Sequence, residues 1–198
     1  IQPAADVRRE LAIDAHAPLV VCAARLQKEK DIATLVAAMK TVAAEFPAAR
    51  CLIAGEGDDK QTLQQLIANL GLSENVRLLG FRSDVLDLMN AGDLFVLPSL
   101  AEPFGLVLLE AMALGKPVIA TRAGGPCEIV AEGATGLLVP PRDPAALAAA
   151  IGRLLRDPAL RAAFGSAGRQ RFFDRFTAQR MAAETLAVYH AALNGATA

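Results

Sequence analysis

The chain has 198 residues, of which 54% are hydrophobic and 21% charged, a composition typical of a folded protein rather than a disordered one. This length suits one domain with a sizeable core and is short for two. A formal net charge of −1 and a pI of about 6.2 lack the basic excess of nucleic-acid-binding domains, and no apolar run reaches the roughly 18 residues of a membrane span.

The chain begins at Ile1, without an initiator Met or a signal peptide, so we expect it to be a fragment of a longer protein. Its three cysteines, Cys22, Cys51 and Cys127, are an odd number at long spacings. We therefore expect no disulfide framework and a reducing, cytosolic environment.

Short apolar runs alternate with longer amphipathic ones through the first 140 residues. The runs at 18–24, 49–55, 75–80, 93–99, 117–121 and 135–140 are expected to be strands, and those at 33–46, 61–71, 84–91 and 104–115 helices. Continuous apolar strands separated by helices predict an α/β fold. We expect a doubly wound, Rossmann-like parallel sheet of about six strands with helices on both faces. Such sheets bind ligands at the carboxyl ends of their strands.

The last third of the chain is expected to form extra C-terminal helices at 143–157, 158–176 and 177–194. Asp143 and Asp157 each precede a proline, which is typical of a helix N-cap followed by the first helical position. Thr177 is a plausible cap for the last helix. Because no linker or repeat interrupts the chain, we treat residues 1–198 as a single domain.

Basic residues follow the first predicted strand, where Arg25 and Lys30 precede a helix. A guanidinium and a mobile ammonium at this place suit a polyanion such as a diphosphate. The alternative is a solvated basic turn. The loop after the second strand has Gly55 and Gly57, which allow a ligand close to the backbone. It fails the dinucleotide-binding pattern G-x-G-x-x-G, because Lys60 replaces the third glycine.

Two further loops have candidate ligand contacts. Phe81, after the third strand, suits stacking on a nucleobase but also covering of the sheet's end. Gly124 and Gly125, after the fifth strand, suit a ligand-facing loop but also an ordinary turn. Neither His16 nor His190 lies in a strand-end loop, so we expect both at the surface and neither as a general base.

The segment EPFGLVLLE, residues 102–110, places two carboxylates around the start of a helix. A residue before proline avoids helical geometry, so Glu102 belongs to the loop and Pro103 to the first helical turn. The amides of Phe104, Gly105 and Leu106 would then be free to bind an anion. Glu110, nearly two turns on, should be partly buried.

Carboxylates accept hydrogen bonds from hydroxyl groups and repel phosphates. Two acids around one anion-binding helix end therefore suit a ligand with phosphates in the middle and hydroxyls at both ends, as in a nucleotide-sugar. The alternatives are an N-cap role for Glu102 and a structural hydrogen bond for Glu110.

The run PSLAEPFGLVLLEAMALGKPVIA, residues 98–120, resembles the long motif of group 1 (family 4) retaining glycosyltransferases, in their C-terminal, donor-binding domain of the GT-B fold. The family also has a Gly-Arg-Leu followed by Lys, matched here by Arg25, Leu26 and Lys30. The resemblance covers about residues 18–194. Ala24 stands where glycine is usual, and Asp31 stands where glycine is common, which places an acid near the phosphate site.

The resemblance implies a role for each candidate residue. Arg25 and Lys30 would hold the donor diphosphate as it leaves, with the amides of Phe104, Gly105 and Leu106. Glu102 would contact the donor sugar and Glu110 the ribose. The base pocket and ligand-facing loop would include Gly55, Phe81, Arg82, Gly124 and Gly125.

The resemblance also implies a cytoplasmic enzyme, with the inner face of the membrane as an alternative location, that needs no metal or cofactor. The acceptor would be bound by an N-terminal domain absent from this chain, so the isolated domain should have little activity. The final helix would pack on that domain or, alternatively, on its own sheet. A non-enzymatic nucleotide-sugar binding module remains a second reading. Another GT-B enzyme, such as an epimerase using Glu102, Glu128 or Glu132, is a third.

Overall fold

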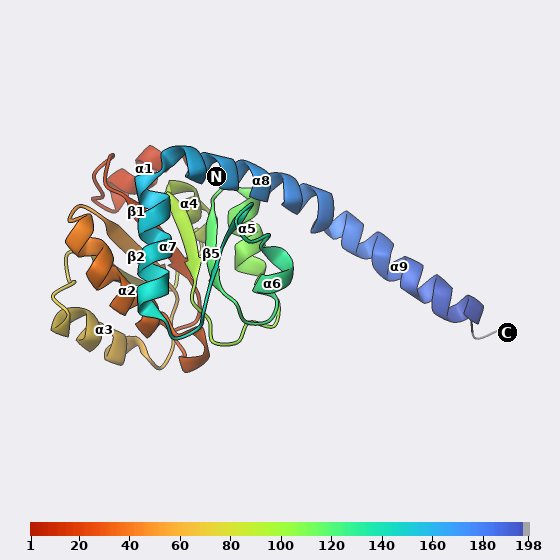
Figure 1. The fold of residues 1–198 in the computed structure, drawn as a ribbon, viewed down its shortest axis with the longest axis horizontal. Coiled ribbons are helices and arrows are strands. Elements are labelled where there is room, and N and C mark those ends of the chain that lie inside the picture. Colours follow the sequence, from red (N-terminus) through yellow and green to blue (C-terminus); the bar gives the residue numbers. More distant parts are fainter. Residues whose placement is uncertain (196–198) are drawn as a thin grey trace.

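The computed structural model describes residues 1–195 and contains a six-stranded sheet in which all strands run parallel (Figure 1). In their order across the sheet, the strands are β3 (Val76–Gly80), β2 (Arg50–Ala54), β1 (Leu19–Ala23), β4 (Leu94–Leu97), β5 (Val118–Thr121) and β6 (Gly136–Val139). Each strand lies inside the range predicted from its apolar run. The predicted parallel sheet is therefore confirmed.

Helices cover both faces of this sheet, as continuous apolar strands require. On one face lie α2 (Ile32–Glu45), α3 (Lys60–Asn69) and α7 (Pro144–Arg156), and on the other α1 (Ala4–Glu10), α4 (Val85–Ala91), α5 (Leu106–Ala113) and α6 (Pro126–Ile129). Side chains of β1 alternate between the two cores: Val20 and Cys22 face the first, and Val21 faces the second. The two cores fix the sheet between the helical layers.

The strand order changes direction between β1 and β4, which are neighbours in the sheet but not in the sequence. Helices leave these two strands toward opposite faces, so the loops at their carboxyl ends diverge and leave a crevice. The loops that carry Arg25, Lys30 and Glu102 follow these two strands. The topology thus brings the predicted phosphate-binding segments to one place.

Side-chain caps begin the C-terminal helices as predicted. The carboxylate of Asp143 accepts a hydrogen bond from the Ala146 amide at 2.8 Å, and that of Asp157 accepts one from the Leu160 amide at 2.9 Å. These caps start α7 and α8 (Pro158–Arg175). The Thr177 hydroxyl accepts from the Arg180 amide at 3.3 Å at the start of α9 (Ala178–Gly195).

The helix α1 was not predicted. It is short and largely polar, and Val7 is its one buried residue, so it has no hydrophobic period that sequence reasoning could detect. Arg8 holds it in place by donating from Nε to the Ala91 carbonyl at 3.0 Å and from Nη2 to Asp93 at 3.1 Å. A part-buried charged contact, together with the single buried residue Val7, attaches this helix to the body.

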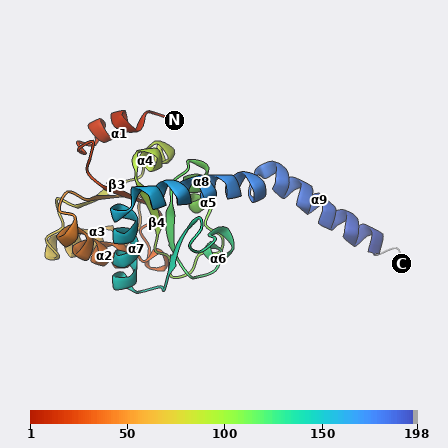
Figure 2. The ribbon, with the colours of Figure 1, turned by 45° about the horizontal axis from the view of Figure 1, so that its top comes forward.

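The helix α9 leaves the body of the protein and extends away from the sheet (Figures 1 and 2). Its large apolar side chains are exposed, namely Met181, Leu186, Val188, Tyr189 and Leu193. Packing of the final helix on its own sheet, one of the two expected arrangements, is therefore wrong. None of the described helices is long and apolar enough to cross a membrane.

The three cysteines are free thiols, as expected. Cys22 and Cys51 are buried on neighbouring strands, and burial raises the pKa of Cys22 to about 12 and that of Cys51 well above its usual value. Both thiols are therefore neutral and unreactive at physiological pH. Cys127 is exposed.

Candidate functional site

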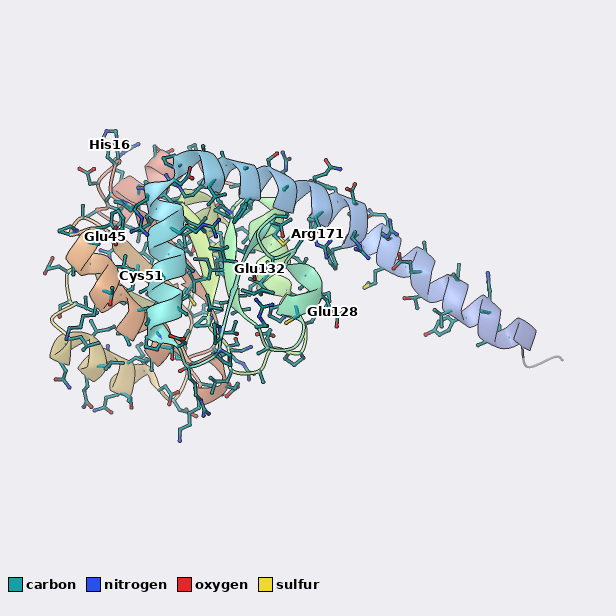
Figure 3. The ribbon with its side chains drawn as sticks, in the orientation of Figure 1. His16, Glu45, Cys51, Glu128, Glu132 and Arg171 are labelled. Atoms are coloured by element: carbon teal, nitrogen blue, oxygen red, sulfur yellow. The ribbon has the colours of Figure 1, made fainter. Side chains whose placement is uncertain are left out.

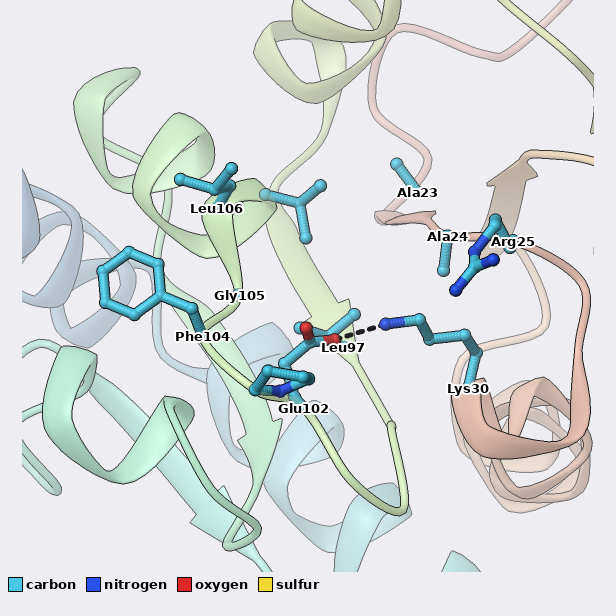
Figure 4. A pocket seen from close by; sticks show the side chains of 11 residues that line it. Ala23, Ala24, Arg25, Lys30, Leu97, Glu102, Phe104, Gly105 and Leu106 are labelled. Carbon is cyan, nitrogen blue, oxygen red and sulfur yellow. Dashed lines mark hydrogen bonds and ion pairs between the residues drawn. The ribbon is translucent and has the colours of Figure 1, made fainter.

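A cavity of about 360 Å³ lies at the carboxyl ends of β1 and β4, at the point where the strand order reverses (Figure 4). Its walls come from the loops after these two strands and from the start of α5. The lining residues are Ala23, Ala24, Arg25, Lys30, Leu97, Glu102, Pro103, Phe104, Gly105, Leu106 and Val107. Six of them were predicted as site residues: Arg25, Lys30, Glu102, Phe104, Gly105 and Leu106.

Lys30 and Glu102 form an ion pair across this cavity. The Lys30 ammonium donates to Oε2 of Glu102 at 2.6 Å, and the two side chains are only 14% and 11% exposed (Figure 4). Lys30 comes from a 3-10 turn, η1 (Lys28–Lys30), and Glu102 from the loop after β4. The pair therefore connects the two loops on either side of the crevice, and each charge partly neutralises the other.

Arg25 is the second cation of the cavity and is far more exposed than Lys30. Its side chain is 69% exposed and lies 3.5 Å from the carboxylate of Glu29. An exposed pair of this kind contributes little to stability. The Arg25 guanidinium is thus available to a ligand in the cavity, whereas Lys30 is engaged by Glu102.

Asp31, the unexpected acid after Lys30, does not enter the cavity lining. Its carboxylate accepts a hydrogen bond from the Thr34 hydroxyl at 2.7 Å. Its backbone has a φ of 45°, in the left-handed region that glycine adopts most easily. This conformation gives a physical reason for the glycine that the glycosyltransferase motif favours here.

The start of α5 differs from the prediction. The helix begins at Leu106, and Gly105 is its N-cap residue with a φ of 104°. Pro103 and Phe104 therefore lie in a turn before the helix, and the expected helical start at 104 is wrong. Within residues 1–195, the Leu106 and Val107 amides donate to no carbonyl, because they begin the helix. The helix amides available at the cavity are those of Leu106 and Val107.

Gly124 and Gly125 hold the Glu102 segment by close backbone contact. The Gly125 amide donates to the Glu102 carbonyl at 2.8 Å, and a parallel bridge joins Glu102 to Gly124. A Cβ on Gly125 would lie 2.2 Å from the Phe104 carbonyl oxygen. Neither glycine lines the cavity. In this structure the two glycines allow their own loop to approach the loop that carries Glu102.

The residues expected around a base, Gly55, Phe81 and Arg82, lie outside this cavity lining. The Gly55 amide donates to the Gly80 carbonyl at 2.8 Å, which joins the loops after β2 and β3. Phe81 is 77% exposed and so does not cover the sheet's end. Phe81 thus presents a free aromatic face at this edge of the sheet.

Arg82 makes a structural ion-pair network. Its guanidinium donates to the Asp84 carboxylate at 2.8 and 2.5 Å and to Glu10 of α1 at 3.2 Å. These contacts raise the pKa of Arg82, and the hydrogen bond from Arg82 lowers the pKa of Asp84. These contacts engage Nε and Nη2 of Arg82 with the two acids.

Glu110 is more exposed than expected. The side chain nevertheless loses enough hydration from its surroundings to raise its pKa. Glu110 does not line the cavity, and it lies on the first turns of α5 beyond Leu106.

Sequence reasoning missed two residues that hold the site together. Ser99 is completely buried, and its hydroxyl donates to Oε2 of Glu102 at 3.2 Å. The carbonyl of Glu29 accepts from the Leu100 amide at 2.8 Å and so ties η1 to the loop after β4. The serine belongs to the motif at 98–120, which was the signal available for it; nothing in the sequence marked Glu29.

The remaining acids and histidines lie away from the cavity lining. His16 is exposed at the periphery near the N-terminal segment (Figure 3). His190 is exposed on α9, and both histidines thus lie at the surface as predicted. Glu132 is bound to Arg122 at 3.2 Å and to the Leu138 amide at 2.7 Å, and Glu128 is exposed. The described residues contain no cluster of three or more His, Cys, Asp or Glu side chains that could hold a metal ion.

A family model described as "Glycosyl transferases group 1" matches residues 4–171. The chain belongs to the group 1 glycosyltransferases. The match includes both strands that flank the cavity and every residue that lines it. The resemblance drawn from the motif at 98–120 is thereby confirmed.

Individual relatives agree with this assignment. The chain is 37% identical over 177 residues to the lipopolysaccharide core biosynthesis glycosyltransferase LpsD of Rhizobium meliloti. The matched segment covers 89% of this chain and 50% of that protein. Among solved structures, sucrose-phosphate synthase from Thermosynechococcus elongatus has a TM-score of 0.86 and 35% identity, covering 98% of this chain and 50% of the other.

A second solved structure contains a sugar nucleotide. It is the Anabaena protein HepE in complex with UDP-glucose, with a TM-score of 0.87 and 33% identity over 95% of this chain and 54% of that one. The glycosyltransferase chain described here thus has a GT-B Rossmann-like fold and spans about half the length of the relatives it matches.

Proposed function

We propose that this chain is the C-terminal, donor-binding domain of a retaining glycosyltransferase of the hexosyltransferase type, and that its substrate is a nucleoside diphosphate sugar. The proposal rests above all on the meeting of Arg25, Lys30 and Glu102 in one cavity at the switch point of the sheet. Cations there suit phosphates, and a carboxylate beside them suits sugar hydroxyls. The solved complex of HepE with UDP-glucose supports the same class of substrate.

The chemistry of glycosyl transfer gives these groups a task. As the bond to the diphosphate breaks, positive charge develops on the sugar and negative charge on the departing phosphate. Arg25, Lys30 and the free helix amides of Leu106 and Val107 would stabilise that negative charge. Removal of one donor of this kind typically lowers the rate on the order of 10²- to 10³-fold. No proton transfer, metal or cofactor is required of these residues.

The remaining roles follow from the length of the ligand. Glu102 would accept hydrogen bonds from hydroxyls of the donor sugar, and Glu110 would bind the ribose. Exposed Phe81, with the backbone of Gly55 and Arg82, would bind the base along the same edge of the sheet. Gly124 and Gly125 would support the sugar end by holding the Glu102 loop.

We also propose that a second, N-terminal domain of the same protein binds the acceptor and closes the site, in the cytoplasm. The apolar side chains of α9 support a helix that packs on that domain, because they are exposed in this chain. On this proposal, the 198-residue chain alone binds donor weakly and transfers little sugar. Rapid transfer by the isolated chain to any acceptor would contradict it.

Calorimetry with UDP, GDP and ADP tests donor binding directly. One nucleoside diphosphate should bind, and Arg25→Ala should weaken it by about 1.5–3 kcal/mol, the usual range for a hydrogen bond to a charged group. The larger loss typical of buried pairs is not expected, because Arg25 is 69% exposed. Unchanged affinity in Glu110→Ala would remove the ribose assignment, and no binding of any nucleotide would refute the proposed function.

A further inference from the structure

Buried polar side chains are few in this protein, and two of them lie directly behind Glu102. Among the described residues, the fully buried polar side chains are Ser99, Thr121 and Thr135. The Thr121 hydroxyl donates to the Ser99 carbonyl, and the Ser99 hydroxyl donates to Glu102. A buried polar group is retained only where its hydrogen bonds are made, so this chain of contacts needs a structural or functional reason.

The two donors to Glu102 share one carboxylate oxygen. Lys30 reaches Oε2 at 2.6 Å and Ser99 reaches the same atom at 3.2 Å. Within residues 1–195, no protein donor reaches the other oxygen, Oε1. Because Glu102 lines the cavity, its second oxygen is left to accept a hydrogen bond from a ligand.

The two donors differ in how well they can orient the carboxylate. Lys30 is a point charge on a flexible stem with three equivalent N–H donors, so it attracts either oxygen about equally. The Ser99 hydroxyl is on a short, fully buried side chain, and the next residue is held by the bond from the Leu100 amide to the Glu29 carbonyl. Ser99 is therefore the donor with a fixed position.

We infer that Ser99 is a positioning residue for sugar recognition: by occupying Oε2, it directs Oε1 of Glu102 toward the hydroxyls of the donor sugar. This inference rests on the proposed function, since it concerns the sugar end of the same cavity. Loss of the Ser99 hydroxyl lets the carboxylate rotate about its last bond while Lys30 stays attached. This loss should weaken recognition of the sugar and leave the diphosphate contacts of Arg25 intact.

The test compares each nucleoside diphosphate with its sugar ester by calorimetry on the 198-residue chain, using UDP with UDP-glucose, GDP with GDP-mannose and ADP with ADP-glucose. Ser99→Ala should weaken the sugar nucleotide about five-fold relative to the matching diphosphate, the size of one ordinary hydrogen bond. Ser99→Cys keeps a similar size and a weak donor. Its ratio of sugar-nucleotide to diphosphate affinity should therefore lie between the ratios of the wild type and of Ser99→Ala.

Thr121→Val is the matched control. It removes a hydrogen bond from the same chain of contacts but leaves the Ser99 hydroxyl in place, so it should lower stability and leave the ratio of the two affinities within about two-fold. An unchanged ratio in Ser99→Ala, or an equal change in Thr121→Val, overturns the inference while leaving the proposed function intact. If wild-type chain binds no nucleotide of either kind, the proposed function fails and the inference with it.

Discussion

The ion pair between Lys30 and Glu102 should stabilise the fold as well as prepare the cavity. The two charged atoms are 2.6 Å apart, and the side chains are 14% and 11% exposed. Removing one partner of a buried pair typically costs about 3–5 kcal/mol, because the other charge stays behind without compensation. Here the cavity admits water, so we expect about 2–3 kcal/mol for Lys30→Gln and for Glu102→Gln alike.

The double variant, with both Lys30→Gln and Glu102→Gln, separates the energy of the ion pair from the contributions of the two side chains. With both charges gone, two amides remain that can hydrogen bond to each other, so the double change should cost no more than about 3 kcal/mol. The coupling between the two positions is then about 2 kcal/mol, inside the range seen for contacting residues. Urea unfolding followed by circular dichroism measures all four proteins. In thermal melts, each single change should lower Tm by about 4–12 °C at 2–4 °C per kcal/mol.

The control is Glu29→Gln, which breaks the exposed pair between Arg25 and Glu29 and should change stability by less than about 1 kcal/mol. If the costs of Lys30→Gln and Glu102→Gln simply add in the double variant, to within about 0.5 kcal/mol, the pair does not exist in solution. That result would refute both the bond and the reading of the cavity as two loops joined by it.

Three other predictions follow from features described above. Gly125→Ala should destabilise the chain by more than about 2 kcal/mol in urea and weaken nucleotide binding, because its Cβ would lie 2.2 Å from the Phe104 carbonyl oxygen; a neutral change would contradict the close approach. Lost hydration raises the pKa of Glu110, so the native chain holds this proton more tightly than the unfolded chain, and stability falls as pH rises from the ordinary glutamate value through the raised one. Glu110→Gln should remove that part of the fall in pH-dependent melts, and an identical pH profile would refute it. Deletion of residues 178–198 should shift Tm by no more than about 2 °C, since the α9 side chains that are described are exposed; a large loss would mean that α9 packs on the body.

The sheet could be predicted from the sequence because local signals and burial agree there. The apolar runs are buried on both faces, apart from the partly buried β3 at the edge of the sheet, and each is short enough to be one strand. The caps at Asp143 and Asp157 made the C-terminal helices equally clear. What escaped was α1, whose attachment depends on Arg8 meeting Asp93, a contact 85 residues apart in the chain.

The sequence predicted which residues form the site but not which of them contact each other. The sequence indicated Lys30 and Glu102 as separate ligands of phosphate and sugar, and the structure has them bound to each other. That pairing depends on the parallel alignment of β1 and β4, which no local pattern encodes. The start of α5 was misplaced for a local reason: the positive φ of Gly105 ends the turn, whereas the proline rule pointed two residues earlier.

One aromatic contact joins the wall of the cavity to the base of the helix α9. Phe176, at the junction of α8 and α9, packs edge-on against Phe104 of the cavity wall, with ring centroids 6.5 Å apart. The 18 residues of α9 form an arm about 27 Å long. A tilt of about 10° at the base of such an arm moves its far end by about 5 Å. Any change in the contact between Phe104 and Phe176 that tilts α9 is therefore magnified at the far end of the helix.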